Sequence, residues 1–183
     1  MLSTFLNMSP TQEYLQLFVI GSTNIDDNSN VAKAQNLEMF MEGCNCASIL
    51  ENFQGKTLHT VGGILKDHTL VKFLNLWISN QYCPNLQFIE ISDCGPFLNP
   101  GRVMRNFAFK TFDSSTSPVF IYTKREGILC PNQTTKQFIS QDYIVRPSDG
   151  NVASISITPN KFQFAVWKMT EQELTEHIKT KFL

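Results

Sequence analysis

The stretch ILKDHTLVKFLNLWISNQYCPNLQFIEISDC, residues 64–94, joins the pattern of a helix to the pattern of a buried strand. In its first half, large apolar side chains recur at i, i+3, i+4, i+7 and i+8, which places them on one face of a helix. Asp67 precedes them, and we expect it to cap the start of this helix. The apolar face is formed by Leu70, Phe73, Leu74, Trp77 and Ile78.

The second half of the stretch predicts a strand. Pro84 ends the helical pattern, because a helix interior does not tolerate proline. The spacing LxxLxLxxC, which is typical of a leucine-rich-repeat strand, follows it. This spacing is carried by Leu86, Ile89, Ile91 and Cys94. Apolar residues are common, so the neighbouring segments decide what a single copy of the spacing means.

Three earlier segments are also typical of strands, and the first of them, YLQLFVI at residues 14–20, ends at a glycine. The first apolar positions of the four strands, taken as Leu15, Leu37, Leu58 and Leu86, are 22, 21 and 28 residues apart. Leucine-rich repeats have a period of about 20–29 residues, in which each unit is a strand with a returning helix or turn.

This spacing predicts an α/β fold with a leucine-rich-repeat-like, curved and mostly parallel sheet that carries helices on one face. The repeat-like part is expected to cover about residues 14–94. A small α/β domain whose strands happen to be evenly spaced is the alternative.

The carboxy-terminal part predicts antiparallel strands instead. Residues 143–146, 152–157 and 162–167 are three short strand candidates. They are joined by the sequences PSDG and TPN, which are typical of antiparallel turns. We expect this antiparallel hairpin to cap the sheet by covering the strand edge that an open solenoid leaves exposed.

A further strand is expected at residues 119–122, and Thr170 and Glu173 form a capping box that predicts a closing helix. Its apolar side consists of Leu174, Ile178 and Phe182. Residues 103–112 fit either a strand or a short helix. All 183 residues are expected to form one domain, with the hairpin and closing helix at about residues 119–183.

The charge and cysteine content disfavour several classes of protein. The chain has 15 basic and 16 acidic residues and a formal net charge of −1, which gives no strong field for binding nucleic acid or an anionic membrane. No apolar run approaches the roughly 20 residues that cross a bilayer. Five cysteines are an odd number and residues 1–10 do not resemble a signal peptide, so we expect an intracellular protein, cytoplasmic or nuclear.

A zinc site is the first chemical possibility that the sequence raises. Cys44 and Cys46 could join His59, His68 or Cys83, because thiolate and imidazole groups are the usual zinc ligands. The spacing argues against it, since structural zinc sites generally use two matched ligand pairs and only one short pair is present.

A thiol enzyme is the second possibility, in which Cys94 or Cys130 would use His59 or His68 as its base. None of these residues lies in a recognisable catalytic motif, and GxSxG, phosphate-loop and GxGxxG motifs are absent from the sequence. We therefore predict no catalytic, metal-binding or cofactor-binding residues. A non-catalytic protein-binding module is expected, with a small thiol-dependent enzyme or a metal-stapled interaction module as alternatives.

Two blocks of the sequence resemble the carboxy-terminal half of the expanded nematode F-box protein family. Residues 64–91 are similar to its block LTDKDLNxFLKxWI…NxxLEYLxI, and residues 141–167 are similar to its closing block xDIRRxDGxxATIxI…FxFxVW. Val71, Asn75 and Pro147 depart from the family pattern, at framework positions. The matching positions are Phe73, Leu74, Trp77, Ile78, Leu86, Ile91, Asp149, Gly150, Ala153, Ile155, Phe164 and Trp167.

The resemblance implies a role in recruiting the substrates of a ubiquitin ligase. In that family an amino-terminal F-box docks on the Skp-type linker of a cullin ubiquitin ligase, and the F-box-associated region holds the target. Nothing before Leu15 resembles an F-box, so we expect a recruiting region with an unknown protein target and only an indirect link to the ligase. Target contacts are expected at Gln87 and Glu90, and neither a cofactor, nor nucleic acid, nor a membrane is expected as a partner.

Overall fold

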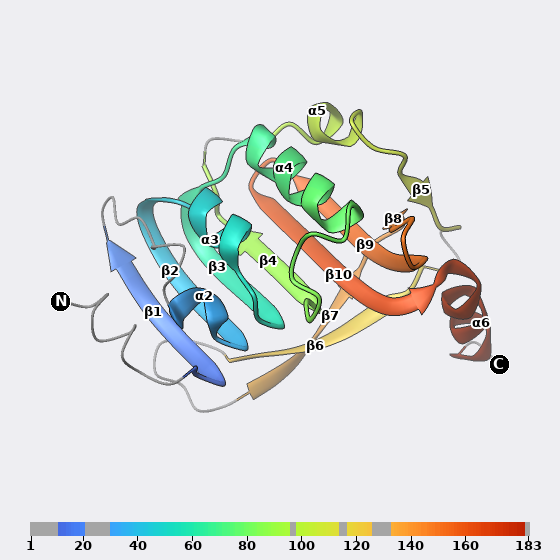
Figure 1. Ribbon diagram of the computed structural model, residues 1–183, viewed down its shortest axis with the longest axis horizontal. Coiled ribbons are helices and arrows are strands. Elements are labelled where there is room, and N and C mark those ends of the chain that lie inside the picture. The colour runs from blue at the N-terminus through green and yellow to red at the C-terminus, as the bar shows by residue number, and fades with distance from the viewer. Residues whose placement is uncertain (1–10, 21–29, 96–97, 114–116, 126–132, 182–183) are drawn as a thin grey trace.

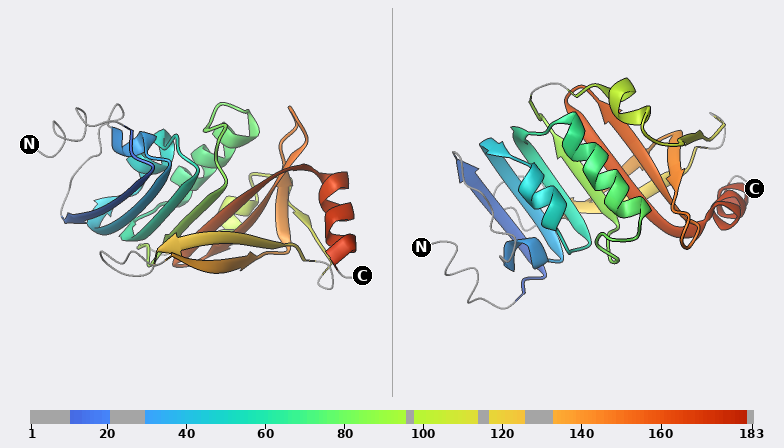
Figure 2. Two further views of the ribbon diagram at one scale, coloured as in Figure 1. Left: turned by 90° about the horizontal axis from the view of Figure 1, so that it is seen from below. Right: turned by 45° about the horizontal axis from the view of Figure 1, so that its top comes forward.

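The computed structural model describes residues 11–20, 30–95, 98–113, 117–125 and 133–181. These residues form one mixed eight-stranded sheet in the order β1-β2-β3-β4-β10-β9-β8-β5 and a separate two-stranded sheet, β6-β7. Most of the helices cover one face of the large sheet, whereas the closing helix and the β6–β7 hairpin lie against the other (Figures 1 and 2). Within these ranges, no helix is both long and apolar enough to cross a membrane.

The first half of the sheet is parallel. Its strands are β1 (Tyr14–Ile20), β2 (Asn36–Asn45), β3 (Thr57–Ile64) and β4 (Phe88–Ser92), and they neighbour one another in chain order. Each connection carries a helix, namely α2 (Asn30–Lys33), α3 (Ala47–Asn52) or α4 (Asp67–Ile78). The predicted α/β fold, with parallel neighbouring strands and helices on one face, is confirmed for this half.

One position in the predicted spacing is wrong. The register places Leu15, Leu37 and Leu58 in one row across the first three strands, but Leu58 is opposite Ile89 of β4. Leu86 lies before the strand begins, where its side chain is buried. The connection through α4 is longer than the two before it. The apolar residue of β4 that is equivalent to Leu58 is therefore Ile89, and this interval is longer than the period of about 20–29 residues of a leucine-rich repeat.

The second half of the sheet is antiparallel. Strand β10 (Lys161–Thr170) pairs with the edge of β4, and β9 (Asn151–Thr158), β8 (Asp142–Val145) and β5 (Lys110–Thr111) follow. The three carboxy-terminal strands are therefore confirmed. They extend the sheet from β4 and so occupy the edge that the parallel strands alone would leave open.

The remaining elements show where the sequence was less informative. The undecided residues 103–112 contain the end of α5 (Pro100–Met104) and the strand β5. Helix α6 (Glu171–Lys181) begins with the predicted capping box, in which Thr170 N donates to Glu173 Oε2 at 2.8 Å. Phe182 and Cys130 lie outside the described residues. Strand β7 (Gln133–Ile139) and the short helices α2 and α3 were not predicted.

Helix α4 packs its predicted apolar face on the sheet. Phe73 makes edge-on contacts with Phe164 of β10, at 5.2 Å between ring centroids, and Trp77 contacts the same ring at 5.2 Å. The Arg146 guanidinium lies 4.9 Å from the Trp77 ring centroid and also pairs with Asp149 at 2.7 Å. The helix therefore binds the parallel and antiparallel halves of the sheet together.

Asp67 does not cap α4 as expected. The helix begins after Lys66, and no side chain caps it; Asp67 is itself the first helical residue. Its carboxylate accepts a hydrogen bond from the backbone N–H of Asn99 at 3.0 Å. A carboxylate in the first turn still interacts favourably with the helix dipole.

Truncation of Trp77 tests whether the packing of α4 holds the two halves of the sheet together. Trp77→Ala should reduce the free energy of unfolding by about 3–5 kcal/mol, because a buried aromatic ring is lost and leaves a cavity. Urea unfolding followed by circular dichroism measures this change. A loss below about 1 kcal/mol would contradict the packing described for α4.

Candidate functional site

The face of strands β1 to β4 that carries no helix is the candidate site, and we call it the helix-free face. Side chains alternate along a strand, so every second residue of β1 to β4 points to this face. On β1 and β2, Phe18 stacks on Phe40 with ring centroids 4.8 Å apart. Phe18 is 47% exposed and Ile20 is 79% exposed, so the β1 side of this face presents large apolar side chains to solvent.

The β6–β7 hairpin covers the part of the helix-free face around β4. Strand β6 (Val119–Arg125) pairs antiparallel with β7, and the hairpin meets the sheet at Phe88. The Phe88 ring stacks on Tyr122 at 4.0 Å and lies 5.8 Å from both Phe120 and Phe138, measured between centroids. This aromatic cluster fixes the hairpin against the sheet.

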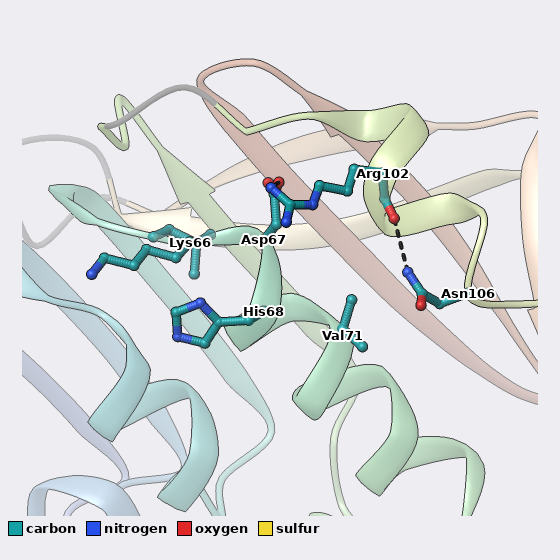
Figure 3. Close-up of a pocket in the computed structure, with 7 residues that line it drawn as sticks. Lys66, Asp67, His68, Val71, Arg102 and Asn106 are labelled. Atoms are coloured by element: carbon teal, nitrogen blue, oxygen red, sulfur yellow. Dashed lines mark hydrogen bonds and ion pairs between the residues drawn. The ribbon is translucent and has the colours of Figure 1, made fainter.

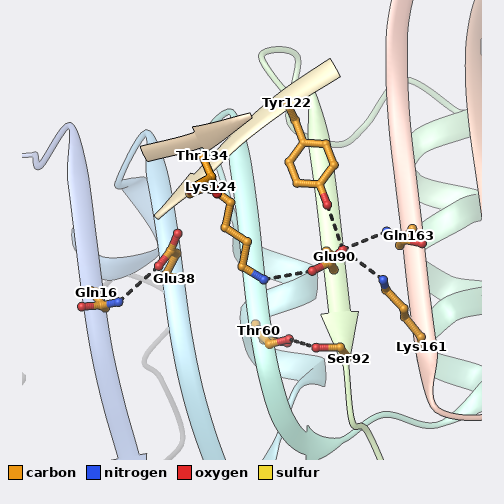
Figure 4. Close-up of polar contacts among 10 residues, drawn as sticks. All are labelled: Gln16, Glu38, Thr60, Glu90, Ser92, Tyr122, Lys124, Thr134, Lys161 and Gln163. Carbon is orange, nitrogen blue, oxygen red and sulfur yellow. Dashed lines mark hydrogen bonds and ion pairs between the residues drawn. The ribbon is translucent and has the colours of Figure 1, made fainter. Parts of the chain in front are cut away.

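Glu90 is the polar centre of the same contact (Figure 4). Its carboxylate pairs with Lys124 Nζ at 3.0 Å and Lys161 Nζ at 3.3 Å. It also accepts hydrogen bonds from Tyr122 Oη at 3.2 Å and Gln163 Nε2 at 2.8 Å. These partners come from β6 and β10, so one carboxylate joins three strands of two sheets.

Electrostatics keep Glu90 ionised. Burial favours the neutral acid and acts to raise its pKa, but the ammonium groups of Lys124 and Lys161 outweigh this effect and lower the pKa to about 2. Burial and the neighbouring Glu90 carboxylate raise the pKa of Tyr122, so its hydroxyl remains a donor. A buried carboxylate is tolerated only when it is paired in this way.

Glu90 and Gln87, the two residues expected to contact a target, lie on β4 and just before it. Glu90 is only 6% exposed and contacts its own chain. Gln87 is half-buried and precedes β4, where its backbone N–H donates to Lys56 and its carbonyl accepts from Val166. Their role in target binding stays a prediction, and the more exposed part of the helix-free face lies on β1.

A small polar cavity adjoins the Glu90 cluster, between β1, β2, β3 and β6. Its volume is about 190 Å³, and we call it the His59 cavity. The His59 side chain is 3% exposed, and neither of its ring nitrogens has a hydrogen-bond partner among the residues described. The cavity is lined by Glu13, Tyr14, Asn36, Glu38, Thr57, His59, Thr123 and Lys124.

The His59 imidazole is held neutral. Burial lowers its pKa to about 4, and Lys124 adds to this effect while Glu90 opposes it. The ring stacks on Tyr122, with centroids 5.5 Å apart. A neutral imidazole has one donor and one acceptor nitrogen, and neither is used by the part of the chain that the structure describes.

Other lining residues are already ordered by hydrogen bonds. The Asn36 amide donates to the backbone carbonyl of Glu13 at 2.9 Å and accepts from Thr57 Oγ1 at 2.8 Å. The Glu38 carboxylate is buried and accepts from Gln16 Nε2 at 3.2 Å. The cavity wall is therefore preorganised.

A larger pocket of about 430 Å³ lies at the start of α4 and contains His68 (Figure 3). Arg102 approaches Asp67 there at 3.9 Å, but its side chain extends into solvent. Asn106 donates to the backbone carbonyl of Arg102 at 2.8 Å. The two cationic side chains of this pocket, Lys66 and Arg102, are long and exposed, so it provides less of a built site than the His59 cavity.

The cysteines that the structure describes are buried thiols. Burial raises the pKa of Cys46 to about 12 and that of Cys83 to about 11, and it raises the pKa of Cys94 as well. The thiol of Cys46 donates to the Gly62 carbonyl, and the thiol of Cys83 donates to the Gly55 carbonyl. These environments disfavour thiolate chemistry. In the described part of the chain, no group of three His, Cys, Asp or Glu residues could hold a metal ion.

Comparison with known proteins identifies no relative of this chain. The chain matches no protein-family model, and neither the curated proteins nor the solved structures contain a match to it. The F-box-associated role therefore stays a prediction that rests on the sequence blocks alone.

Neutralising Glu90 should weaken the attachment of the hairpin. Glu90→Gln removes the charge that balances Lys124 and Lys161, and we expect a loss of about 2 kcal/mol in the free energy of unfolding. Hydrogen exchange should accelerate in β6 and β7 more than in β2 and β3. Glu176→Gln, the same change on exposed α6, is the control, and equal effects of the two variants would refute the role of Glu90.

His59 should make the fold sensitive to mild acid. Its pKa is about 4 in the folded chain and 6.5 ordinarily, so between these values the unfolded chain binds a proton that the folded chain does not. Stability should therefore fall by roughly 3 kcal/mol as the pH drops from 6.5 to 4. The His59 part of this dependence should be absent in His59→Phe, in which urea midpoints across that range should fall less and only near pH 4, where carboxylates such as Glu90 begin to bind protons in the unfolded chain. Identical pH curves for the two proteins would contradict the burial of a neutral His59.

Proposed function

We propose that this chain is a non-catalytic protein-binding module of the F-box-associated type, and that its target binds on the β1 side of the helix-free face. The observation that carries this proposal is the exposure of Phe18 and Ile20 beside the stacked ring of Phe40. Large apolar side chains grouped on a surface are typical of sites where proteins bind.

The arrangement of the strands supports the same function. Parallel strands joined by short helices on one face leave the opposite face as an extended surface, which solenoid proteins use for binding. We propose that this half of the sheet is curved in the manner of a leucine-rich repeat and that the antiparallel half caps it. The inferred partner is an unknown protein in the cytoplasm or nucleus, with an indirect link to a cullin ubiquitin ligase through that target.

A catalytic function has less support. The proposed thiol nucleophile Cys94 is buried, and burial raises its pKa, which disfavours the reactive thiolate. His59 has no hydrogen-bond partner among the described residues and is therefore not paired with a cysteine there.

Capture of partners by tagged full-length protein tests the proposed function. Phe18→Ser together with Ile20→Ser should reduce the recovery of the target at least fivefold in quantitative mass spectrometry, because the apolar surface is removed. Ile121→Ser together with Ile139→Ser is the matched control, because these two isoleucines are each 57% exposed on the hairpin. Retained capture by the β1 variant, or equal loss in the control, would contradict the assigned face. Both variants are first compared with the parent chain by thermal unfolding.

A further inference from the structure

We propose that the His59 cavity binds a neutral primary carboxamide, and that this group is the side chain of an asparagine or glutamine on the target protein. The inference rests on the proposed function, because it names the polar group that the target places beside the apolar residues of β1. It adds an uncharged polar subsite to an apolar surface.

The buried imidazole of His59 indicates that the cavity takes a polar ligand. His59 lines the cavity and is 3% exposed, and neither of its ring nitrogens has a hydrogen-bond partner among the described residues. Buried polar groups in native proteins are nearly always hydrogen-bonded, because the loss of water is otherwise not compensated. The neutral ring offers one donor and one acceptor to a group that enters the cavity.

The charges around His59 disfavour a ligand of either sign. A cation would meet the ammonium of Lys124, which lines the cavity, and the charge of Lys161, which acts on the same ring. Glu90 is already paired with both of these lysines. An anion would meet the two glutamates of the lining. An uncharged ligand avoids both repulsions and gives up less hydration energy on entering the cavity.

A primary carboxamide matches the mixture of donors and acceptors in the wall. Its carbonyl oxygen accepts hydrogen bonds, and its NH₂ group donates two. Lys124 directs one of its three ammonium hydrogens at Glu90, and another can bind the carbonyl oxygen. The NH₂ group can donate to the acceptor nitrogen of His59 and to Thr57 Oγ1, whose own hydrogen is directed at Asn36. A hydroxyl group, which has a single hydrogen to donate, would use fewer of these partners.

The size of the cavity restricts the ligand to one side chain. Its volume of about 190 Å³ is below the roughly 300–1,000 Å³ of pockets for drug-sized ligands. Water is the competing occupant, since a molecule of liquid water takes up about 30 Å³ and several would fit. A probe that displaces this water and contacts His59 therefore decides between the two.

The position of the cavity relative to β1 also restricts the target. Tyr14 lines the cavity, and Phe18 and Ile20 follow on the same face of β1. At about 3.3 Å per strand residue, Phe18 lies about 13 Å and Ile20 about 20 Å along the strand from Tyr14. An extended target segment would therefore carry its carboxamide about four to six residues from an apolar side chain.

Titration with propionamide tests the carboxamide subsite without knowledge of the target. The ring nitrogens of His59 are followed by NMR in the full ¹⁵N-labelled chain, and their signals should shift along a saturable curve. Propionate, propylammonium and methyl ethyl ketone are controls of similar size, which carry a negative charge, a positive charge, and a carbonyl without the NH₂ group. Each control should bind at least tenfold more weakly than propionamide. Equal binding of any control would overturn the proposal, and so would the absence of a saturable shift with propionamide, which would leave water as the occupant.

Two histidine variants provide a second readout. His59→Phe removes both ring nitrogens but keeps an aromatic ring beside Tyr122. His68→Phe is the matched control, because His68 is exposed at the start of α4. The relaxation of propionamide's own signals should increase with the parent chain and with His68→Phe, but not with His59→Phe. An equal increase with the two variants would contradict the role of His59.

A peptide distinguishes a target side chain from a free small amide. An acetylated peptide that carries glutamine four residues from leucine should bind at least tenfold more tightly than propionamide, and replacement of its glutamine by glutamate should remove this gain. Phe18→Ser with Ile20→Ser should also remove the gain but leave the affinity for propionamide unchanged. A peptide that binds no more tightly than propionamide would overturn the assignment to a target side chain. Because propionamide binding is independent of Phe18 and Ile20, its failure is distinguishable from failure of the partner capture.

Discussion

Strand β4 is covered on both of its faces and paired along both of its edges, and this double burial constrains the rest of the protein. Ile89 and Ile91 point to α4, where apolar packing is sufficient. Phe88 and Glu90 point to the β6–β7 hairpin, and the carboxylate there requires cations and donors from its surroundings. Lys124 reaches it from the hairpin and Lys161 reaches it from β10. The buried acid and the aromatic cluster around Phe88 thus together hold the hairpin against the sheet.

The same ion pair shapes the proposed site. Lys124 is directed to Glu90 and lies in the wall of the His59 cavity, so its charge is balanced before any ligand arrives. The ring of His59 is confined by Tyr122, which is itself held by Glu90. Attachment of the hairpin and formation of the cavity are consequently one event. The exposed apolar residues of β1 lie outside this arrangement, which separates the proposed binding surface from the part of the face that stabilises the fold.

Local sequence patterns predicted the elements better than the site. The recurring leucines and the face of α4 are short-range signals, and they located the parallel strands. Strand β7 carried no such signal, because QTTKQFI is mainly polar and only Phe138 of its described side chains is buried. The cavity joins His59 to Thr123 and Lys124, which are more than 60 positions away, so no spacing near His59 distinguishes it from a histidine in a solvated strand. Glu90 was identified as a polar residue on a buried strand, but its cover by the hairpin depends on contacts that a linear pattern does not encode.

The antiparallel pairing of β10 with β4 limits where further strands can be added to the sheet. A new strand–helix unit cannot be added beside β4, because β10 occupies that edge with five residue pairs from Lys161 to Ala165. At β1, by contrast, β2 is the one neighbouring strand among the residues described. Duplication of a unit would therefore lengthen the array on the β1 side, and it would move the apolar residues that face solvent away from the fixed Glu90 cluster. The residues of the proposed binding surface and those of the Glu90 cluster could then change at different rates in evolution.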